Sequence, residues 1–319
     1  MPPKLIVITG PTAAGKTRLG ILLAQKLDGE IISADSMQIY RKLNIGTAKP
    51  TQAEMENIPH RMIDITDPTV PYSVARYVTE AAACTDDILK RDKQAILVGG
   101  TGLYIDSLLA GRHFAESPED TDLREALSAR YDQEGGDALW EALRKVDPES
   151  AARLHPNDKK RVLRALEVYT LTGQTITAHN LETQTIPPRY EALKIAITAR
   201  DRADLYARID SRVDAMLEAG LITEVTQLLE AGLSPASTAM QAIGYKEMIQ
   251  AITGRISIVE AVERIKQESR RYAKRQLSWL RRDPNVRWIE WEGEPDFENA
   301  LQISTEFCRE TGIIAENGE

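Results

Sequence analysis

The run from Gly10 to Thr17 has two glycines, a lysine and a threonine at the spacing of a phosphate-binding loop. The apolar run Leu5 to Ile8 stands before it, and a predicted helix begins near Lys16. Backbone N–H groups of such a loop and the helix N-terminus bind phosphate oxygens. Both flanks argue against a glycine turn with an unrelated lysine. We therefore expect a di- or triphosphate on Gly10, Pro11, Thr12, Ala13, Ala14, Gly15, Lys16 and Thr17.

Two side chains of this loop carry chemistry of their own. The Lys16 ammonium can reach a β-phosphate, and the Thr17 hydroxyl can ligate Mg²⁺. The motif does not say whether the phosphate belongs to a nucleotide.

Asp35 follows a second strand-like run, Glu30 to Ala34. Ligands of open α/β sheets lie beyond the carboxyl ends of the strands, so Asp35 could face the reacting end of the bound phosphate compound. Asp and Ser are also common N-caps of helices. The residue types alone leave both interpretations open.

A third strand-like run, Ala95 to Val98, continues into two glycines and Thr101. P-loop proteins that cleave nucleoside triphosphates usually have an aspartate near the end of such a strand to help hold Mg²⁺. Here the strand ends in glycine. The nearest substitute is Asp64, which follows the short strand-like run Arg61 to Ile63. This difference weakens a kinase or ATPase assignment.

Eight blocks of sequence resemble the tRNA dimethylallyltransferase family and stand in that family's order. They are GPTAAGKT (10–17), ADSMQIYRKLNIGTAKP (34–50), PHRMIDI (59–65), LVGGTGLY (97–104), HPNDKKRVLRALEVY (155–169), LYARIDSRVDAM (205–216), QAIGYKE (241–247) and AKRQLSWLRR (273–282). Many families share the phosphate loop, whereas the Asp-Ser-x-Gln-Ile-Tyr and Gly-Thr-Ala-Lys-Pro sequences of the second block and the Gly-Tyr-Lys-Glu sequence of the seventh are far more specific. Two cysteines cannot build the zinc finger of the eukaryotic members, so the resemblance is to the bacterial form.

The resemblance implies transfer of a dimethylallyl group from dimethylallyl diphosphate to N6 of the adenosine immediately 3′ of the anticodon in tRNA. Asp35 resembles the family's general base, a role worth roughly 10²–10⁴ in rate. Lys16, the loop amides and Mg²⁺ on Thr17 would stabilise the departing diphosphate. Thr101 would donate a hydrogen bond to the oxygen that bridges carbon and phosphorus.

Arg208 and Arg212 are four residues apart on a predicted helix, Leu205 to Leu217, so they share one face. Guanidinium groups suit phosphate through paired hydrogen bonds, and the resemblance assigns this helix to the diphosphate. The alternative is a solvated ion-pair face with the neighbouring acids Asp204, Asp210 and Asp214.

The adenine must leave the anticodon-loop stack to reach the diphosphate, which implies a flipped base. Asp35, Thr101 and the residues after Asp35 are expected to line its pocket, and the Gln38 amide can both donate to and accept from an adenine edge. The remaining tRNA contacts follow from the resemblance, although a helix-capping turn is an alternative for Gly244. The expected tRNA-binding residues are Asp35, Ser36, Met37, Gln38, Thr101, Lys159, Lys160, Arg161, Gln241, Gly244, Tyr245 and Lys246, with His155 beside them.

The net charge of −8 argues against a nucleic-acid partner at first sight. Basic residues are nevertheless concentrated between Arg264 and Arg287, where only Glu268 and Asp283 oppose them. Such a stripe fits contact with a phosphate backbone, and it fits a solvated helix face equally well.

The strand-like runs alternate with helical patterns, which predicts an α/β fold with a P-loop NTPase-like parallel sheet core. Strand signals vanish between Ala115 and Arg189 and return at Ala192 to Thr198. We therefore expect a core domain of residues 1–114 and 190–319 and a helical insertion domain of residues 115–189, which by resemblance contacts the tRNA anticodon stem-loop.

Within the insertion, helices are predicted at Asp122 to Tyr131, Ala138 to Val146 and Asn157 to Thr172. Gln174 to Arg189 lacks periodicity and is predicted to be a connector. Near the C-terminus, the spacing of Val262, Ile265, Tyr272 and Trp279 predicts core positions on a helix.

We also expect a cytoplasmic monomer with no membrane partner. No apolar run approaches the roughly 20 residues that span a bilayer, and no charged-then-apolar leader precedes the first strand. Cys84 and Cys308 are too few for a disulfide framework.

Three alternatives remain at this stage. An adenylate (AMP) dimethylallyltransferase would share the phosphate loop and Asp35 without needing the insertion or the basic stripe. A small-molecule P-loop kinase would turn over ATP. A non-catalytic RNA-binding protein would have no use for the loop, Asp35 and Thr101 together.

Overall fold

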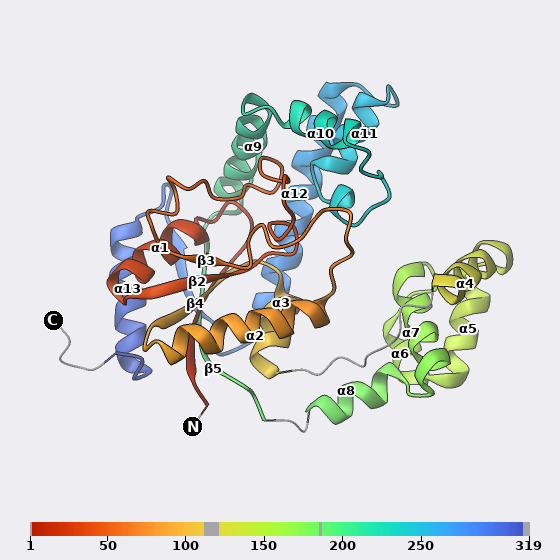
Figure 1. Ribbon diagram of the computed structural model, residues 1–319, viewed down its shortest axis with the longest axis horizontal. Coiled ribbons are helices and arrows are strands. Elements are labelled where there is room, and N and C mark those ends of the chain that lie inside the picture. Colours follow the sequence, from red (N-terminus) through yellow and green to blue (C-terminus); the bar gives the residue numbers. More distant parts are fainter. Residues whose placement is uncertain (1, 112–120, 185–186, 315–319) are drawn as a thin grey trace. The chain divides into compact units, whose positions relative to one another are not determined.

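The computed structural model describes residues 2–111, 121–184 and 187–314. Its strands form a six-stranded sheet in the order β3-β2-β4-β1-β5-β6, and every pair of neighbours is parallel (Figure 1). The predicted α/β fold with a parallel sheet is therefore confirmed. The strands are β1 (Lys4–Thr9), β2 (Gly29–Ala34), β3 (His60–Arg61), β4 (Gln94–Gly99), β5 (Glu191–Ala199) and β6 (Arg287–Trp291).

The helices connect these strands and build the rest of the chain. They are α1 (Lys16–Lys26), α2 (Val74–Lys90), α3 (Gly102–Ala110), α4 (Thr121–Glu134), α5 (Gly136–Val146), α6 (Pro148–Arg153), α7 (Lys159–Thr172), α8 (Ile176–Gln184), α9 (Arg202–Glu218), α10 (Leu221–Glu230), α11 (Tyr245–Ile252), α12 (Ile258–Leu280), α13 (Phe297–Glu310) and a 3₁₀ turn, η1 (Ala239–Gln241).

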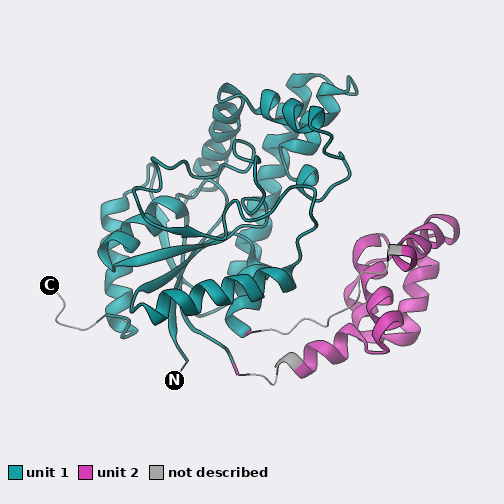
Figure 2. Cartoon of the chain, in the orientation of Figure 1, with its two compact units in different colours: residues 1–110, 188–319 teal, residues 111–187 magenta. Residues whose placement is uncertain are grey.

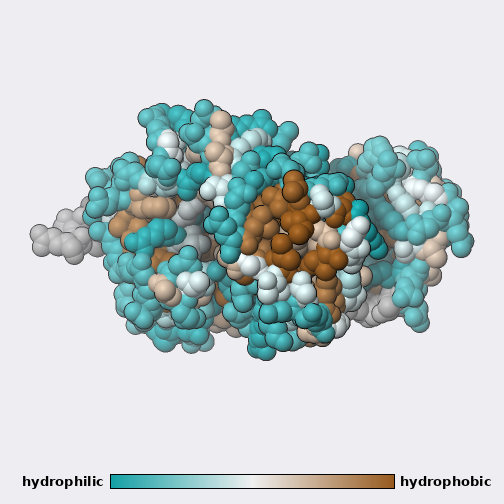
Figure 3. Space-filling view, turned by 90° about the horizontal axis from the view of Figure 1, so that it is seen from above, coloured by the Kyte–Doolittle hydropathy of each residue, from teal (hydrophilic) through white to brown (hydrophobic). Residues whose placement is uncertain are grey.

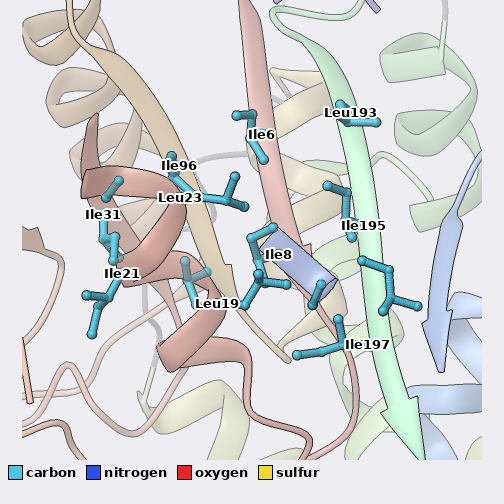
Figure 4. Packing of buried hydrophobic residues seen from close by; sticks show 14 of the residues in the cluster. Ile6, Ile8, Leu19, Ile21, Leu23, Ile31, Ile96, Leu193, Ile195 and Ile197 are labelled. Carbon is cyan, nitrogen blue, oxygen red and sulfur yellow. The ribbon is translucent and has the colours of Figure 1, made fainter. Parts of the chain in front are cut away.

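The strands are held by a core of branched aliphatic side chains. Ile6 and Ile8 of β1 pack with Ile195 of β5 and with Leu19 and Leu23 of α1 (Figure 4). Because strand side chains alternate between the two faces, residues two apart in β1 meet the same helix. Each such fully buried side chain stabilises the fold by roughly 1.5–3 kcal/mol, so the segment in front of the phosphate loop is firmly fixed.

The strand order brings the three expected chemical segments together. β4 lies between β1 and β2, and the carboxyl ends of parallel strands share one edge of the sheet. The phosphate loop follows β1, Asp35 follows β2, and Gly100 and Thr101 follow β4. The fold therefore makes neighbours of segments that are far apart in the sequence.

The chain divides into two compact units (Figure 2). Unit 1 comprises Met1–Ala110 and Pro188–Glu319, and unit 2 comprises Gly111–Pro187. The Leu109 carbonyl accepts hydrogen bonds from the N–H groups of Arg189 (3.0 Å) and Tyr190 (3.3 Å), so the two chain segments of unit 1 meet where unit 2 is inserted. The expected boundary at 114/115 lies outside the described residues.

Unit 2 is helical and has a hydrophobic core of its own, around Leu139, Leu143 and Val162. The predicted connector at Gln174 to Arg189 is wrong in part, because it contains α8. This polar helix shows no periodicity in the sequence and is stabilised by hydrogen bonds: Thr177 donates to Asp147 of the α6 cap at 2.6 Å.

Unit 1 has a second core, in which α9 to α12 pack around Ile39 and Tyr40 from the segment after β2. This packing fixes the segment that follows Asp35. Figure 3 shows a broad hydrophobic area near the centre of the view. The exposed large hydrophobic side chains of unit 1 include Ile258 and Val259 of α12. Among the described residues, no helix combines the length and apolarity needed to cross a bilayer.

Candidate active site

A cavity of about 900 Å³ lies where the three chemical segments meet. The phosphate loop forms part of its wall, and α9 and α12 form another part. The lining residues that were expected from the sequence are Thr12, Ala13, Gly15, Lys16, Thr17, Asp35, Gln38, Arg208 and Arg212. The structure thus brings most of the expected diphosphate-binding residues to one place.

The other members of the loop give it its shape. Gly10 has φ +142°, and a Cβ at this position would lie 2.2 Å from the Ile197 carbonyl oxygen. Gly15 has φ +92°, and its Cβ would lie 2.8 Å from the Phe297 ring. Ala14 is buried and its carbonyl accepts from Trp291 Nε1 at 3.1 Å. Both glycines are therefore required by close contacts with the sheet and α13.

Lys16 is enclosed in the loop, where its Nζ donates to the Pro11 carbonyl at 2.7 Å. Burial, and after it the positive charge of Arg212, lower the pKa of Lys16 to about 7, although the carboxylate of Asp35 acts in the opposite direction. A lysine held in this way is stabilised by an anion that enters the cavity.

Arg208 and Arg212 point to the phosphate loop from α9. Arg208 Nε donates to the Ala13 carbonyl at 3.2 Å, and Arg212 Nη1 donates to Thr12 Oγ1 at 3.3 Å. The Arg208 Nη1 atom is buried without a hydrogen-bond partner. An orphaned buried guanidinium donor at a phosphate loop is a site for an anionic oxygen.

Arg208 and Arg212 do not form the alternative, a solvated ion-pair face with the acids of α9. Asp210 pairs with Arg270, and Asp214 pairs with Lys266 at 2.7 Å, so these acids face α12. Burial lowers the pKa of Arg212 from its usual value, and the carboxylates of Asp35 and Glu54 oppose that shift.

Both interpretations of Asp35 describe real features. Its Oδ1 accepts from the N–H groups of Met37 (2.8 Å) and Gln38 (3.2 Å), which is the local capping pattern, although a turn and not a helix follows. Asp35 also lines the large cavity and a second cavity. The turn therefore fixes the carboxylate at a wall that faces both spaces.

The second cavity has a volume of about 370 Å³ and adjoins the first. The residues common to both walls are Thr12, Asp35, Thr47, Arg212 and Tyr272. The apolar side chains that line the second cavity include Met37, Ile209, Val213, Met216, Ile243 and Ile265; Ser36 also lies there.

Two side chains of α12 at the site were missed from the sequence. Gln276 is buried; its Oε1 accepts from Thr12 N and its Nε2 donates to the Gly100 carbonyl, both at 2.9 Å. Tyr272 was predicted to be core, as Ile265 is, but it lines both cavities. Burial, and after it the negative charge of Asp35, raise the pKa of Tyr272 to about 12. Only the AKRQLSWLRR block pointed to Gln276, as one residue among ten.

Thr101 lies one residue beyond the cavity-lining Gly99 and Gly100. Its Oγ1 accepts from Ser36 N at 3.2 Å. Thr101 therefore joins the end of β4 to the turn after β2.

Gln38 lines the large cavity, but its amide is already partly used. Nε2 donates to the carbonyls of Thr47 and Ala48, both at 3.2 Å. Since an amide NH₂ has two hydrogens, the free capacity in this conformation is the acceptor Oε1. The expectation that Gln38 both donates to and accepts from a base is wrong for this arrangement.

The block from Gln241 to Lys246 is divided between surface and core. Gln241 and Lys246 line the second cavity. Gly244 has φ +98° and is the N-cap of α11, which supports the capping interpretation. Tyr245 has no exposed surface and donates to Glu224 Oε1 at 2.5 Å. The expectation that the Tyr245 side chain contacts RNA is wrong, because packing in the α9–α12 core hides it.

The basic residues of unit 2 lie at the beginning of α7. Lys159 pairs with Asp132 at 2.6 Å, and Arg161 is largely exposed beside Asp158. Lys160 is exposed, and the exposed His155 accepts from Asn157 N. These side chains are available to a partner of unit 2.

No group of three or more His, Cys, Asp or Glu side chains among the described residues could hold a metal ion by itself. Mg²⁺ commonly takes only one or two protein ligands and completes its shell with phosphate oxygens and water. Thr17 at the cavity wall fits that mode. Asp64 is engaged by Lys49 and does not line the cavity, so it does not replace the missing aspartate of a kinase site.

Comparisons with known proteins agree on one family. A family model described as IPP transferase matches residues 38–283. The chain is 49% identical to the tRNA dimethylallyltransferase of Geobacillus thermodenitrificans over 290 residues, 91% of each chain. The tRNA isopentenylpyrophosphate transferase structure of Staphylococcus epidermidis matches with TM-score 0.70 and 44% identity, covering 97% of this chain and 99% of the other. A eukaryotic dimethylallyltransferase acting on tRNA matches with TM-score 0.81 and 32% identity, over 97% of this chain and 80% of the other.

Proposed function

The chain belongs to the IPP transferase family of tRNA dimethylallyltransferases, and from this premise we propose that it transfers a dimethylallyl group from dimethylallyl diphosphate to N6 of the adenosine immediately 3′ of the anticodon in tRNA. The observation that carries this proposal is the position of Asp35. It stands on the wall shared by a cationic cavity at the phosphate loop and an adjoining, more apolar cavity.

The diphosphate binds at the phosphate loop. Arg208 Nη1, which has no partner in the free protein, donates to one of its oxygens, and Arg212 and Lys16 face the same space. Burial lowers the pKa of both Lys16 and Arg212, so these two cations are poorly hydrated, and they stabilise the charge that develops on the leaving diphosphate. Mg²⁺ held by the Thr17 hydroxyl and the phosphate oxygens supplies further charge neutralisation when it is bound.

The transfer itself needs a base. A bond forms between N6 and the allylic carbon while the bond from that carbon to the bridging oxygen breaks, and the electron pair of the broken bond leaves with the diphosphate. The N6 proton passes to the Asp35 carboxylate. Asp35 is held for this purpose by the N–H groups of Met37 and Gln38. No covalent enzyme intermediate is required.

The tRNA is recognised partly by charge. On α12, Arg271, Lys274 and Arg275 are exposed, as is Arg281 directly after the helix, and Arg275 lines the second cavity. Together with Lys160 and Arg161 of unit 2, these cations contact the phosphate backbone of the anticodon stem-loop. We place this reaction in the cytoplasm and assign it to a monomer.

The experiment offers radiolabelled dimethylallyl diphosphate and Mg²⁺ with unmodified tRNA or AMP as separate acceptors. Asp35→Asn keeps the size of the side chain and removes the base, and we expect it to lower kcat by about 10²–10⁴ while dimethylallyl diphosphate still binds. Asp92→Asn makes the same change at an exposed loop residue and should leave transfer unchanged.

Each other result has a definite meaning. Label on AMP alone would replace the proposal with the adenylate dimethylallyltransferase alternative. ATP turnover without labelled product would indicate a kinase. Full activity of Asp35→Asn would contradict the assignment of Asp35 as the base but not the assignment of the substrates.

A further inference from the structure

The Glu224 side chain, on α10, accepts hydrogen bonds from the backbone of the loop from Asn44 to Gly46. Its Oε2 accepts from the N–H groups of Asn44 (3.0 Å) and Ile45 (2.9 Å), and its Oε1 accepts from Gly46 N (3.3 Å). Hydrogen bonds to an ionised carboxylate are roughly twice as strong as neutral ones, so one side chain fixes three successive residues.

Tyr245 completes this arrangement from α11. Its buried hydroxyl donates to Glu224 Oε1, and burial together with the Glu224 carboxylate raises the pKa of Tyr245, which keeps the proton on the donor. A Cβ on Gly46 would lie 2.4 Å from Tyr245 Cε2. The ring and the loop therefore fit only because residue 46 is glycine.

The fixed loop continues directly into the cavity. Thr47 and Ala48 follow Gly46, and their carbonyls accept both hydrogens of the Gln38 amide. Thr47, Ala48 and Gln38 all line the large cavity, and Thr47 also lines the apolar one. The position of the Gln38 acceptor, Oε1, is thus determined by the loop.

Glu224 itself lies away from this space. Together with Asn44 and Ile45 it lines a separate cavity of about 630 Å³, whose lining residues include none of those that line the large cavity. A change at Glu224 can therefore affect the reaction only through the residues that it holds, namely the loop and Tyr245.

We propose that Glu224 and Tyr245 are positioning residues that set the acceptor side of the site through the 44–48 loop and Gln38. This inference rests on the proposed transfer to tRNA. It assigns to Tyr245 an action through protein contacts, where the sequence predicted contact with RNA.

Glu224→Gln tests the inference directly. One of the two acceptor oxygens becomes an NH₂ group that faces backbone donors, so the loop shifts. A displacement of about 1 Å at a reacting site costs about 10²-fold, and we expect a loss of this order in kcat/KM for tRNA with the dissociation constant of dimethylallyl diphosphate unchanged. Glu230→Gln is the matched control, because Glu230 is exposed on the same helix.

A double-mutant cycle separates positioning from a general loss of stability. If Glu224 acts through Gln38, Glu224→Gln should add little to the loss caused by Gln38→Ala alone. Should Glu224→Gln not fold, Tyr245→Phe keeps the buried ring and removes one hydrogen bond, for which we expect a smaller loss of about tenfold.

Two results would overturn the inference: independent, multiplicative losses in the double variant, or equal losses of tRNA transfer and diphosphate affinity in Glu224→Gln. An absence of tRNA transfer in the unaltered protein would instead overturn the proposed function, so the two failures are distinguishable.

Discussion

The pKa of Lys16 should depend on whether a diphosphate is bound beside it. In the free protein its charge is opposed by burial and by Arg212, which bring its pKa to about 7. A bound diphosphate brings negative oxygens to the same place and favours the charged form. Lys16 must therefore be protonated in the complex even at a pH where the free protein has partly lost that proton.

This coupling predicts a pH dependence of diphosphate binding. Below pH about 7 Lys16 is already charged, and its contribution to affinity is complete. As the pH rises above that value, binding must take up a proton, and affinity should fall by up to about tenfold per pH unit until the pKa of the complex is reached. Calorimetry with dimethylallyl diphosphate in buffers of different ionisation enthalpy measures this proton uptake directly.

Replacement of the lysine provides the comparison. Lys16→Met should bind weakly and lose the proton uptake, leaving only the titration of the diphosphate itself. Lys26→Met, at an exposed position on the same helix, should behave like the unaltered protein. Equal proton uptake with and without Lys16 would assign the effect to the ligand alone.

At the level of elements, α12 ties the site together. Gln276 bonds to the phosphate loop at Thr12 and to the end of β4 at Gly100, so it fixes two segments that no backbone hydrogen bond joins at that point. Because the Thr12 N–H already donates to Gln276, the diphosphate must bind to the N–H groups of later residues in the loop. A helix from the C-terminal third of the sequence thereby determines which N–H groups of the phosphate loop are free to bind the diphosphate.

A pair of substitutions tests this clamp. A Cβ on Gly100 would lie 2.1 Å from Gln276 Nε2, so Gly100→Ala should displace the glutamine and lower kcat by about 10²-fold. Gln276→Ala should cause a similar loss by releasing Thr12. In the double variant the clash is gone, and the second substitution should cost little. Steady-state kinetics with tRNA measure the cycle, and Gln267→Ala, exposed on α12, is the control.

Fully additive losses in that cycle would mean that Gly100 and Gln276 act separately. In that case the 3.3 Å approach of the same Cβ to the Gly10 carbonyl oxygen would be the stronger effect of Gly100→Ala.

The sequence predicted those elements whose pattern is strong. β1, β2, β4 and β5 were predicted as strands from apolar runs, and the glycine loop indicated where the first helix begins. α8 was not predicted, because its stability comes from hydrogen bonds to Asp147 and not from an apolar face. A pattern in the sequence therefore predicts an element only where neighbouring residues stabilise it, and not where a distant residue does.

The site residues also divide into those that a local pattern marks and those that only distant contacts bring to the site. Lys16, Asp35 and Arg212 could be found because motif or helical spacing marks them. Gln276 and Glu224 could not, since a polar residue on a helix gives no sign of which distant backbone it will bind. Tyr245 belonged to a specific block and was assigned to RNA, whereas its neighbours in the fold make it a packing residue.

At the level of the whole molecule, the phosphate chemistry and the insertion are separable. Every described residue that lines the two cavities belongs to unit 1, and unit 2 has its own core. The net charge of −8 is compatible with a tRNA substrate because exposed cations are concentrated on α12 and at the beginning of α7. We therefore expect unit 2 to contribute to the capture of tRNA and not to the binding of diphosphate.

Excision of unit 2 tests this division. Because the Leu109 carbonyl bonds to Arg189 and Tyr190, a short glycine–serine linker in place of residues 112–187 can close the gap without strain on unit 1. We expect the shortened protein to keep its thermal transition and its affinity for dimethylallyl diphosphate, and to lose transfer to tRNA. In the full chain, Lys160→Ala with Arg161→Ala should raise KM for tRNA and reduce the slope of log affinity against log salt by about one per cation. If the shortened protein still modifies tRNA with unchanged KM, recognition resides in unit 1, and the basic stripe of α12 is sufficient for it.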